Sequence, residues 1–207
     1  VIHNWAIEQA LPIPVSSNPF AIQHDFNHLF TVQYSGNFGR LHDINTILDA
    51  AVIIRKRPVQ FVFIGGGAKQ ALIDEYCKSH SLKNVLRLNY QPRDVLPYSL
   101  GACNLSTVAL IPGAENNMAP CKFYGILASG KGILLIAKKS CDLAQLVLTE
   151  KIGLVIEPGE SEALAEDVLK LSKNPEHVQA MGMRARSLYE KQFGRERSTL
   201  AYASLLQ

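Results

Sequence analysis

Short apolar runs alternate with amphipathic segments along most of the chain, and this alternation most constrains how it can fold. Strand-like runs rich in Val, Ile, Leu and Phe lie at residues 30–35, 60–64, 85–88, 106–111, 132–137 and 153–157. Helical patterns separate them; in residues 43–55 one apolar stripe comprises Ile44, Ile47, Leu48, Ala51 and Ile54. Such alternation is typical of βαβ units with right-handed crossovers. We therefore expect an α/β fold with a doubly wound, parallel, six-stranded, Rossmann-like sheet.

Further amphipathic patterns predict the remaining helices. They fall at residues 67–80, 93–102, 122–129, 142–149 and 161–173. Two more helices close the chain. One begins with Asn174 as the N-cap and Pro175 at the first helical position, and the other follows Gly194. Residues 1–28 are rich in Pro and Asn, so we expect a linker or entry segment there.

Size and charge exclude several classes of protein. The 207 residues, 47% of them hydrophobic, suit one domain or one lobe of a two-lobed protein. Because the chain begins with Val1, we expect a fragment or a processed product. No apolar run approaches the ~20 residues of a membrane span, and no secretory signal opens the chain. A net charge of +3, without a basic run interleaved with aromatics, argues against a nucleic-acid partner.

The cysteines indicate the compartment. Their spacing is not that of a metal site, and we expect all of them to be reduced and buried: Cys77, Cys103, Cys121 and Cys141. This favours a cytoplasmic protein. The sequence contains no Ser-His-Asp order, paired catalytic carboxylates or HExxH, so no catalytic residue is assigned and no metal site is expected.

Lys122 gives the first indication of a ligand. In IPGAENNMAPCKFYGILASG, residues 111–130, it stands in the first turn of an apolar helix. Helix N-termini carry partial positive charge, so a cation there is best explained by a bound anion, usually phosphate. The alternative is a solvated surface Lys. The preceding loop could hold sugar hydroxyls, or form only an exposed turn, through Glu115, Asn116, Asn117 and Met118.

The loop SGNFGRLHD, residues 35–43, also has the composition of a phosphate site. It follows an expected strand, and ligands of doubly wound sheets bind beyond the carboxyl ends of the strands. Glycines allow close backbone approach, an amide or neutral imidazole can donate a hydrogen bond, and Arg can pair in a forked geometry. The candidates are Gly36, Asn37, Gly39, Arg40 and His42. The alternative is an ordinary turn with an exposed Arg.

Two other loops follow strands at the same edge. In IGGGAKQ, a base or ribose could lie against Gly65, Gly66 and Gly67, or the glycines could form only a tight turn. In NYQPRDVLP, the residues that could stack on a base are Tyr90 and Arg93. The alternative for this loop is a helix start whose first turn is set by Pro92 and Asp94.

Taken in order, these segments resemble the C-terminal, nucleotide-sugar-binding lobe of family 4 glycosyltransferases of the GT-B fold, especially bacterial exopolysaccharide and O-antigen transferases. VIHNWA is similar to the interdomain segment, YSGNFGRLHDINTILDAA to the first strand, phosphate loop and helix, and FVFIGGGAKQ to the second turn. NVLRLNYQPRDVLP is similar to the loop that packs on the donor base, MAPCKFYGILASGKGILLI to the "PSKxYexxAxGxPVI" signature, and GLVIEPGESEALAEDV to the closing segment.

The resemblance implies the organisation of the chain. Residues 1–28 would be an interdomain or entry segment, residues 29–190 the nucleotide-sugar-binding domain, and residues 191–207 a helix packing back toward an N-terminal lobe that is missing here. The donor would be a nucleoside-diphosphate sugar, with Tyr124 among the nucleotide-binding residues and no cofactor or metal required. The transfer would retain configuration, and a lipid-linked acceptor would place the protein at the inner face of the membrane.

This chain departs from the family pattern at its acidic positions. Many members carry two glutamates eight positions apart, the second of which grips the ribose, and these positions hold Asn117 and Gly125 here. The Arg and Lys of the family's first loop fall at Asn37 and His42, so their role would pass to Arg40 and Lys122.

We therefore expect the donor-binding lobe of a hexosyltransferase, acting on a glycan or lipid-linked acceptor in bacterial polysaccharide synthesis. Without the N-terminal lobe, the chain alone should be inactive. The alternatives are a non-catalytic or degenerate nucleotide-sugar-binding module and a sugar-nucleotide epimerase of GT-B architecture.

Overall fold

A six-stranded parallel sheet forms the centre of the molecule. The computed structural model describes residues 4–6, 10–116, 118 and 120–205. The strands are β1 (Phe30–Asn37), β2 (Val59–Gly66), β3 (Val85–Leu88), β4 (Leu105–Ala109), β5 (Gly132–Ile136) and β6 (Gly153–Ile156). They lie in the order β3-β2-β1-β4-β5-β6, with parallel pairing at every junction. The expected fold class is confirmed.

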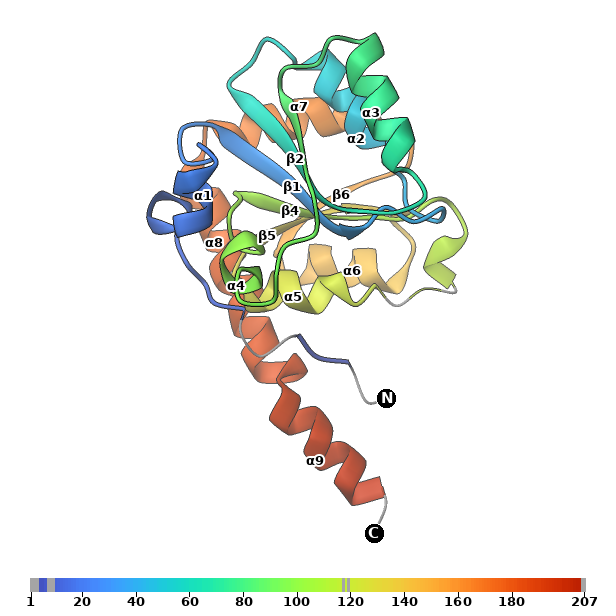
Figure 1. The fold of residues 1–207 in the computed structure, drawn as a ribbon. Coiled ribbons are helices and arrows are strands. Elements are labelled where there is room, and N and C mark those ends of the chain that lie inside the picture. Colours follow the sequence, from blue (N-terminus) through green and yellow to red (C-terminus); the bar gives the residue numbers. More distant parts are fainter. Residues whose placement is uncertain (1–3, 7–9, 117, 119, 206–207) are drawn as a thin grey trace.

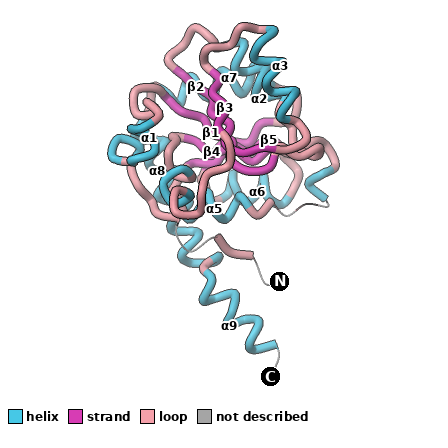
Figure 2. Tube along the Cα trace, viewed as in Figure 1, coloured by secondary structure: helices cyan, strands magenta, loops and turns pink. Residues whose placement is uncertain are grey.

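Helices cover both faces of this sheet (Figures 1 and 2). One face carries α2 (Asn45–Ile53), α3 (Gln70–Ser79) and α7 (Ser161–Ser172). The other carries α1 (Pro19–Gln23), α4 (Leu96–Ser99), α5 (Lys122–Ala128) and α6 (Asp142–Thr149). The long helix α8 (Pro175–Leu188) contributes to the cores of both layers. The π-helix η3 (Tyr189–Phe193) then leads to α9 (Arg195–Leu205).

The sequence of β2 explains why helices are needed on both faces. Successive side chains of a strand point to opposite faces of a sheet. Phe61 and Phe63 enter the core beneath α2, whereas Val62 and Ile64 pack with α1 on the other side. Because both sets of side chains are apolar, a face of the sheet without covering helices would expose apolar surface to water.

The entry segment folds further than a linker would. A short 3-10 helix, η1 (Val15–Ser17), precedes α1. The side chain of Asn18 caps α1 by accepting hydrogen bonds from the backbone N–H groups of Phe20 and Ala21, at 3.0 and 3.2 Å. Phe20 is buried against the sheet. Residues 15–26 thus belong to one covering layer of the fold.

Helix α4 is much shorter than the helix expected at residues 93–102. It comprises Leu96–Ser99 and has Pro97 within its first turn. Pro97 has no N–H to donate to the carbonyl oxygen of Arg93, so the helical hydrogen bonds are interrupted there. A turn precedes α4, in which the backbone N–H groups of Val95 and Leu96 both donate to the Pro92 carbonyl oxygen at 3.1 Å. Asp94 is exposed, and no side chain caps this helix. The alternative of a helix start set by Pro92 and Asp94 therefore holds for Pro92, whose carbonyl oxygen closes the turn, and is wrong for Asp94.

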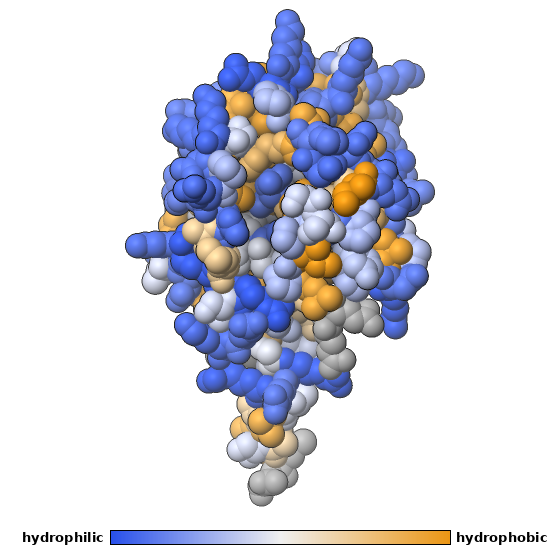
Figure 3. Space-filling model, turned by 90° about the vertical axis from the view of Figure 1, so that its left-hand side faces the viewer, coloured by the Kyte–Doolittle hydropathy of each residue, from blue (hydrophilic) through white to orange (hydrophobic). Residues whose placement is uncertain are grey.

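The surface is mainly hydrophilic in the view of Figure 3, and the C-terminal helix projects from the sheet domain. Hydrophilic side chains cover most of one face, with smaller apolar patches between them (Figure 3). Helix α9 extends away from the sheet domain (Figure 1), and Leu200 and Tyr202 on it are exposed. Among the residues that the structure describes, no helix has the length and apolar character needed to cross a membrane.

The cysteines are not all in the core. Cys103 is buried, Cys77 and Cys141 are half-buried, and Cys121 is exposed where helix α5 begins. The expectation of burial is therefore wrong for Cys121, because the loop before α5 lies at the surface.

Candidate functional site

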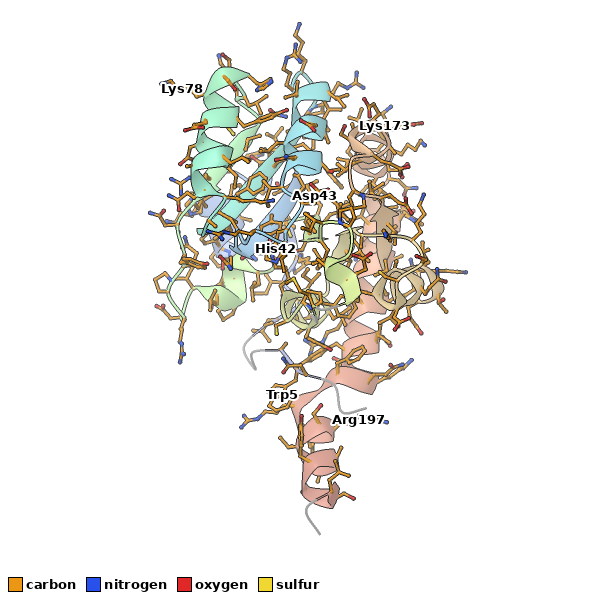
Figure 4. All side chains as sticks on the ribbon, turned by 90° about the vertical axis from the view of Figure 1, so that its right-hand side faces the viewer. Trp5, His42, Asp43, Lys78, Lys173 and Arg197 are labelled. Carbon is orange, nitrogen blue, oxygen red and sulfur yellow. The ribbon has the colours of Figure 1, made fainter. Side chains whose placement is uncertain are left out.

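The candidate site lies where the order of the sheet reverses. Strand β1 pairs with β2 on one side and with β4 on the other. From β1 the sheet continues through β2 and β3 in one direction and through β4, β5 and β6 in the other. Such a reversal leaves a crevice beyond the carboxyl ends of the two strands, where doubly wound folds bind ligands. The loop after β1 leads to α2, and the loop after β4 leads to α5. Figure 4 shows His42 and Asp43 in this central region, while Lys78 and Lys173 point outwards elsewhere.

The amine of Lys122 is the least satisfied cation of this region. The residue as a whole is half-buried, but its Nζ is buried and has no hydrogen-bond partner among the described residues. It lies 3.5 Å from the centroid of the Tyr34 ring. Burial lowers the pKa of Lys122 from 10.5 to about 7. The alternative of a solvated surface Lys is therefore wrong.

Gly36 lies beside this amine. A Cβ at Gly36 would make only ordinary contacts with the Cε and Nζ of Lys122, at 3.8 Å, and the requirement for glycine comes from its φ of +122°. Strand β1 ends here, so its last residues and the start of α5 are brought together. The structure thus joins two of the phosphate candidates, Gly36 and Lys122, although they come from different loops.

The side chain of His42 links the two ends of the loop after β1 through contacts of its Nδ1. Its Nδ1 lies 2.8 Å from the Tyr34 hydroxyl, 2.9 Å from the Asn37 carbonyl oxygen and 3.1 Å from the Gly39 backbone nitrogen. This nitrogen is engaged within the loop. Burial and the nearby Lys122 lower the pKa of His42, which keeps the imidazole neutral near pH 7.

Two other candidates of this loop, Asn37 and Arg40, are exposed residues. The side chain of Asn37 lies against the glycine turn after β2. Asp43 fixes the start of α2 by accepting a hydrogen bond from the backbone N–H of Thr46, at 3.2 Å. The N-terminus of α2 thus begins at the site.

Chain packing accounts for two glycines of the 65–67 turn. A Cβ at Gly65 would collide with the carbonyl oxygen of Gly36, and one at Gly67 would collide with the side chain of Asn37. Both glycines also have positive φ, +136° and +143°. The two turns therefore need glycine in order to approach each other, which favours the tight-turn alternative for Gly65 and Gly67.

Tyr90 lies over the middle glycine. Its hydroxyl donates a hydrogen bond to the Gly66 carbonyl oxygen at 3.1 Å, while the residue remains 61% exposed. An exposed aromatic ring fixed at one end offers a stacking surface for a base. Arg93 is exposed on the same loop.

Tyr124 lies on another side of α5 from Lys122. Two residues along a helix are about 200° apart, and the Tyr124 ring packs edge-on against Phe193, with centroids 5.3 Å apart. Burial raises its pKa, and its hydroxyl lies near the backbone of Asn4. This places Tyr124 against η3 and the entry segment.

Two of the sugar candidates line a separate hollow of about 520 Å³. Glu115 and Met118 bound it together with Tyr124 and the start of α6, whereas none of the phosphate candidates does. One oxygen of Glu115 lies 3.9 Å from the Nζ of Lys138. Its other oxygen is buried without a described hydrogen-bond partner. Asn117 and the side chain of Asn116 lie outside what the structure describes.

Sequence reasoning missed two residues of the site. Tyr34 carries the Lys122 amine, and Lys69 donates a hydrogen bond from Nζ to the His42 carbonyl oxygen at 2.7 Å. Lys69 could have been noticed because it follows the glycine turn after β2. Tyr34 had no such signal, because an aromatic residue inside a strand is read as core. Within the described ranges, no three His, Cys, Asp or Glu side chains are grouped to hold a metal ion.

Comparison with known proteins identifies the family. The sequence profile described as "Glycosyl transferases group 1" matches residues 23–188, which is most of the chain. The chain belongs to the group 1 glycosyltransferases. Its architecture is that of one lobe of the GT-B fold.

Individual relatives agree with this assignment. The chain is 32% identical over 169 residues to WbjE of Pseudomonas aeruginosa, described as a probable glycosyltransferase, covering 79% of this chain and 41% of WbjE. It is 30% identical over 149 residues to WcaI of Escherichia coli K12, named for glycosyl transfer in colanic acid biosynthesis, covering 70% and 36%. The chain thus corresponds to less than half the length of either relative.

A solved structure shows the same fold. Anabaena HepE in complex with UDP-glucose superimposes with a TM-score of 0.79 at 16% identity, covering 98% of this chain and 55% of HepE.

Proposed function

We propose that this chain is the donor-binding lobe of a glycosyltransferase that uses a nucleoside-diphosphate sugar. The observation that carries the proposal is the buried amine of Lys122 at the crevice between β1 and β4, which has no hydrogen-bond partner among the described residues. A buried cation is costly without a counter-charge, and a diphosphate supplies one. The description of HepE with UDP-glucose makes a uridine nucleotide the first donor to test.

Each part of the donor has a proposed place. The diphosphate would contact Lys122, Arg40 and the backbone around Gly36, which together supply charge and close approach. The base would stack on Tyr90 or Arg93. Tyr90 lies beside the Gly66 turn, so the nucleoside and diphosphate places are adjacent in the fold.

The sugar would be held by Glu115 and Met118, which line the hollow described above. A carboxylate oxygen without a hydrogen-bond partner among the described residues can accept hydrogen bonds from sugar hydroxyls. Asn116 and Asn117 remain proposed sugar contacts on sequence grounds.

The chemistry of transfer would need a second lobe. The relatives are more than twice as long as the matched region, and a GT-B site lies between two lobes. We propose a missing N-terminal acceptor lobe, toward which residues 191–207 would pack, with residues 1–28 connecting the two. Transfer would retain configuration. Cations and helix N-termini would stabilise the departing diphosphate without a metal.

The name of WcaI motivates the wider role. The whole protein would add a hexose to a glycan or lipid-linked acceptor during bacterial polysaccharide synthesis, in the cytoplasm at the inner face of the membrane. The second reading, a degenerate donor-binding module, is motivated by Gly125, because the family's ribose-gripping Glu is absent there.

A titration of UDP-, GDP- and TDP-sugars, with product detection on the full-length protein, tests both readings. Saturable binding of one nucleotide class together with transfer supports the enzyme. Binding without product in the two-lobed protein supports the degenerate module. Absence of binding to every nucleotide would overturn the proposal. Repeating the titration in EDTA tests whether a metal is required.

A further inference from the structure

Tyr34 occupies an unusual position for a core aromatic. It is 1% exposed and lies among buried rings, with its centroid 5.7 Å from that of Phe38 and 6.0 Å from that of Phe63. Its free ring face carries the Lys122 amine at 3.5 Å. A cation over a desolvated aromatic face is held by the quadrupole of the ring.

The hydroxyl of Tyr34 adds a second contact to a ring that core packing already orients. It donates a hydrogen bond to the Asn37 carbonyl oxygen at 3.1 Å and lies 2.8 Å from the Nδ1 of His42. The ring is therefore clamped between the core below and the loop after β1 above. The hydroxyl of Tyr34 thus contacts the loop after β1. Its ring face contacts Lys122, the first residue of α5.

We propose that Tyr34 is a positioning residue for donor binding: its ring holds the ammonium group of Lys122 at the place where the diphosphate is bound. This inference rests on the proposed function and deepens it, because it assigns a role to a residue that would not touch the donor. Without the ring, the described residues would offer the flexible Lys122 side chain no hydrogen bond or ring contact to hold its amine beside Gly36.

The surrounding charges are consistent with a neutral ring acting as the platform. Burial raises the pKa of Tyr34 far above neutrality, as does the nearby Tyr90, so no phenolate competes for the amine. The pKa of His42 is lowered, by burial and in part by the positive charges of Lys122 and Lys69, so its imidazole is neutral as well. The ring face is thus the contact that the described residues offer to the Lys122 amine.

A double-mutant cycle tests the inference. UDP affinity is measured by calorimetry for the unaltered chain, Tyr34→Leu, Lys122→Met and the double variant. Tyr34→Phe tests rescue because it keeps the ring. Phe61→Leu is the matched control, since Phe61 is buried in the same core cluster without a described contact to Lys122. Thermal melting of each variant verifies folding.

The expected result is strong coupling between the two residues. Lys122→Met should weaken UDP binding about tenfold to a hundredfold, as for a lost charge-assisted contact. Tyr34→Leu should weaken it about tenfold, yet add less than about threefold in the Lys122→Met background. Tyr34→Phe should recover most of the affinity lost in Tyr34→Leu. Phe61→Leu should bind UDP within about threefold of the unaltered chain.

Several outcomes would overturn the inference. Additive losses in the cycle, or an equal loss in Phe61→Leu, would show that Tyr34 acts only through general stability. Failure of Tyr34→Phe to recover affinity would exclude the ring as the platform. If the unaltered chain does not bind UDP or another nucleoside diphosphate, the proposed function fails and the inference fails with it. If the unaltered chain binds but the cycle shows no coupling, only the inference about Tyr34 fails.

Discussion

The buried amine of Lys122 makes a direct prediction at the scale of a single residue. Lys122→Ala should weaken binding of a nucleoside diphosphate by roughly 1.5–3 kcal/mol, the usual value for a hydrogen bond to a charged group. Binding of the bare nucleoside should change far less, because only phosphate meets the amine. Isothermal titration with UDP and uridine measures both. Equal diphosphate affinity in the variant would show that Lys122 makes no phosphate contact.

The same residue predicts how binding depends on pH. Burial lowers the pKa of Lys122 to about 7, and a bound diphosphate would raise it again by stabilising the ammonium form. Binding then takes up a proton, so UDP affinity should fall by about tenfold or more between pH 7 and pH 9. The terminal phosphate has a pKa of about 6 and stays ionised over this range.

Two groups close to Lys122 do not contribute to this titration. The pKa of His42 is lowered and that of Tyr34 is raised, so both stay neutral between pH 7 and pH 9. Lys122→Met should flatten the pH profile. A profile that is the same with and without Lys122 would assign the titration to another group.

Gly125 carries a third prediction at this scale. Among the described residues, a Cβ there would meet the Cδ1 of Leu100 alone, at 4.0 Å, which is an ordinary contact. Glycine in a helix interior costs up to about 1 kcal/mol relative to a good helix former. Gly125→Glu should therefore leave the melting temperature unchanged or raise it by about 2–4 °C. A fall of many degrees would mean that the position cannot accept a side chain.

At the scale of elements, the contact between α8 and the start of β5 depends on close backbone approach. A Cβ at Gly182 would collide with the carbonyl oxygen of Gly130, which is backbone and cannot rotate away. Gly182→Ala should therefore destabilise the fold by about 1–3 kcal/mol, in spite of the better helix propensity of Ala. Urea unfolding measures the difference.

Gly125→Ala is the matched control for this test. Both glycines lie inside helices, but only Gly182 faces backbone. The control should gain stability by up to about 1 kcal/mol. If the two variants behave alike, helix propensity rather than packing decides the outcome.

At the scale of the whole molecule, the chain alone should bind a nucleoside-diphosphate donor without transferring its sugar. It covers 41% of WbjE and 36% of WcaI, so we propose that an acceptor lobe is missing. The chain alone should bind a nucleoside diphosphate weakly and form no glycosylated product. Incubation with donor and acceptor, followed by mass spectrometry, measures this. Repeated turnover by these 207 residues would contradict the two-lobe proposal.

The sequence determined most of the local structure. The six strands lie within a few residues of their expected positions, and α8 begins at Pro175 with Asn174 accepting a hydrogen bond from the His177 backbone N–H. These features depend on the periodicity of neighbouring side chains and on cap chemistry, both of which are readable along the chain. Where Pro97 interrupts such a pattern, α4 shortens.

The assembly of the site depended on tertiary structure. The sequence indicated Lys122 and the loop after β1 separately, but only the pairing of β1 with β4 brings Lys122 onto the ring of Tyr34. The reason is physical: burial and contact between distant residues depend on the order of strands in the sheet. Local periodicity does not encode that order, so it could not show that the amine is buried or that two of the glycines serve chain packing.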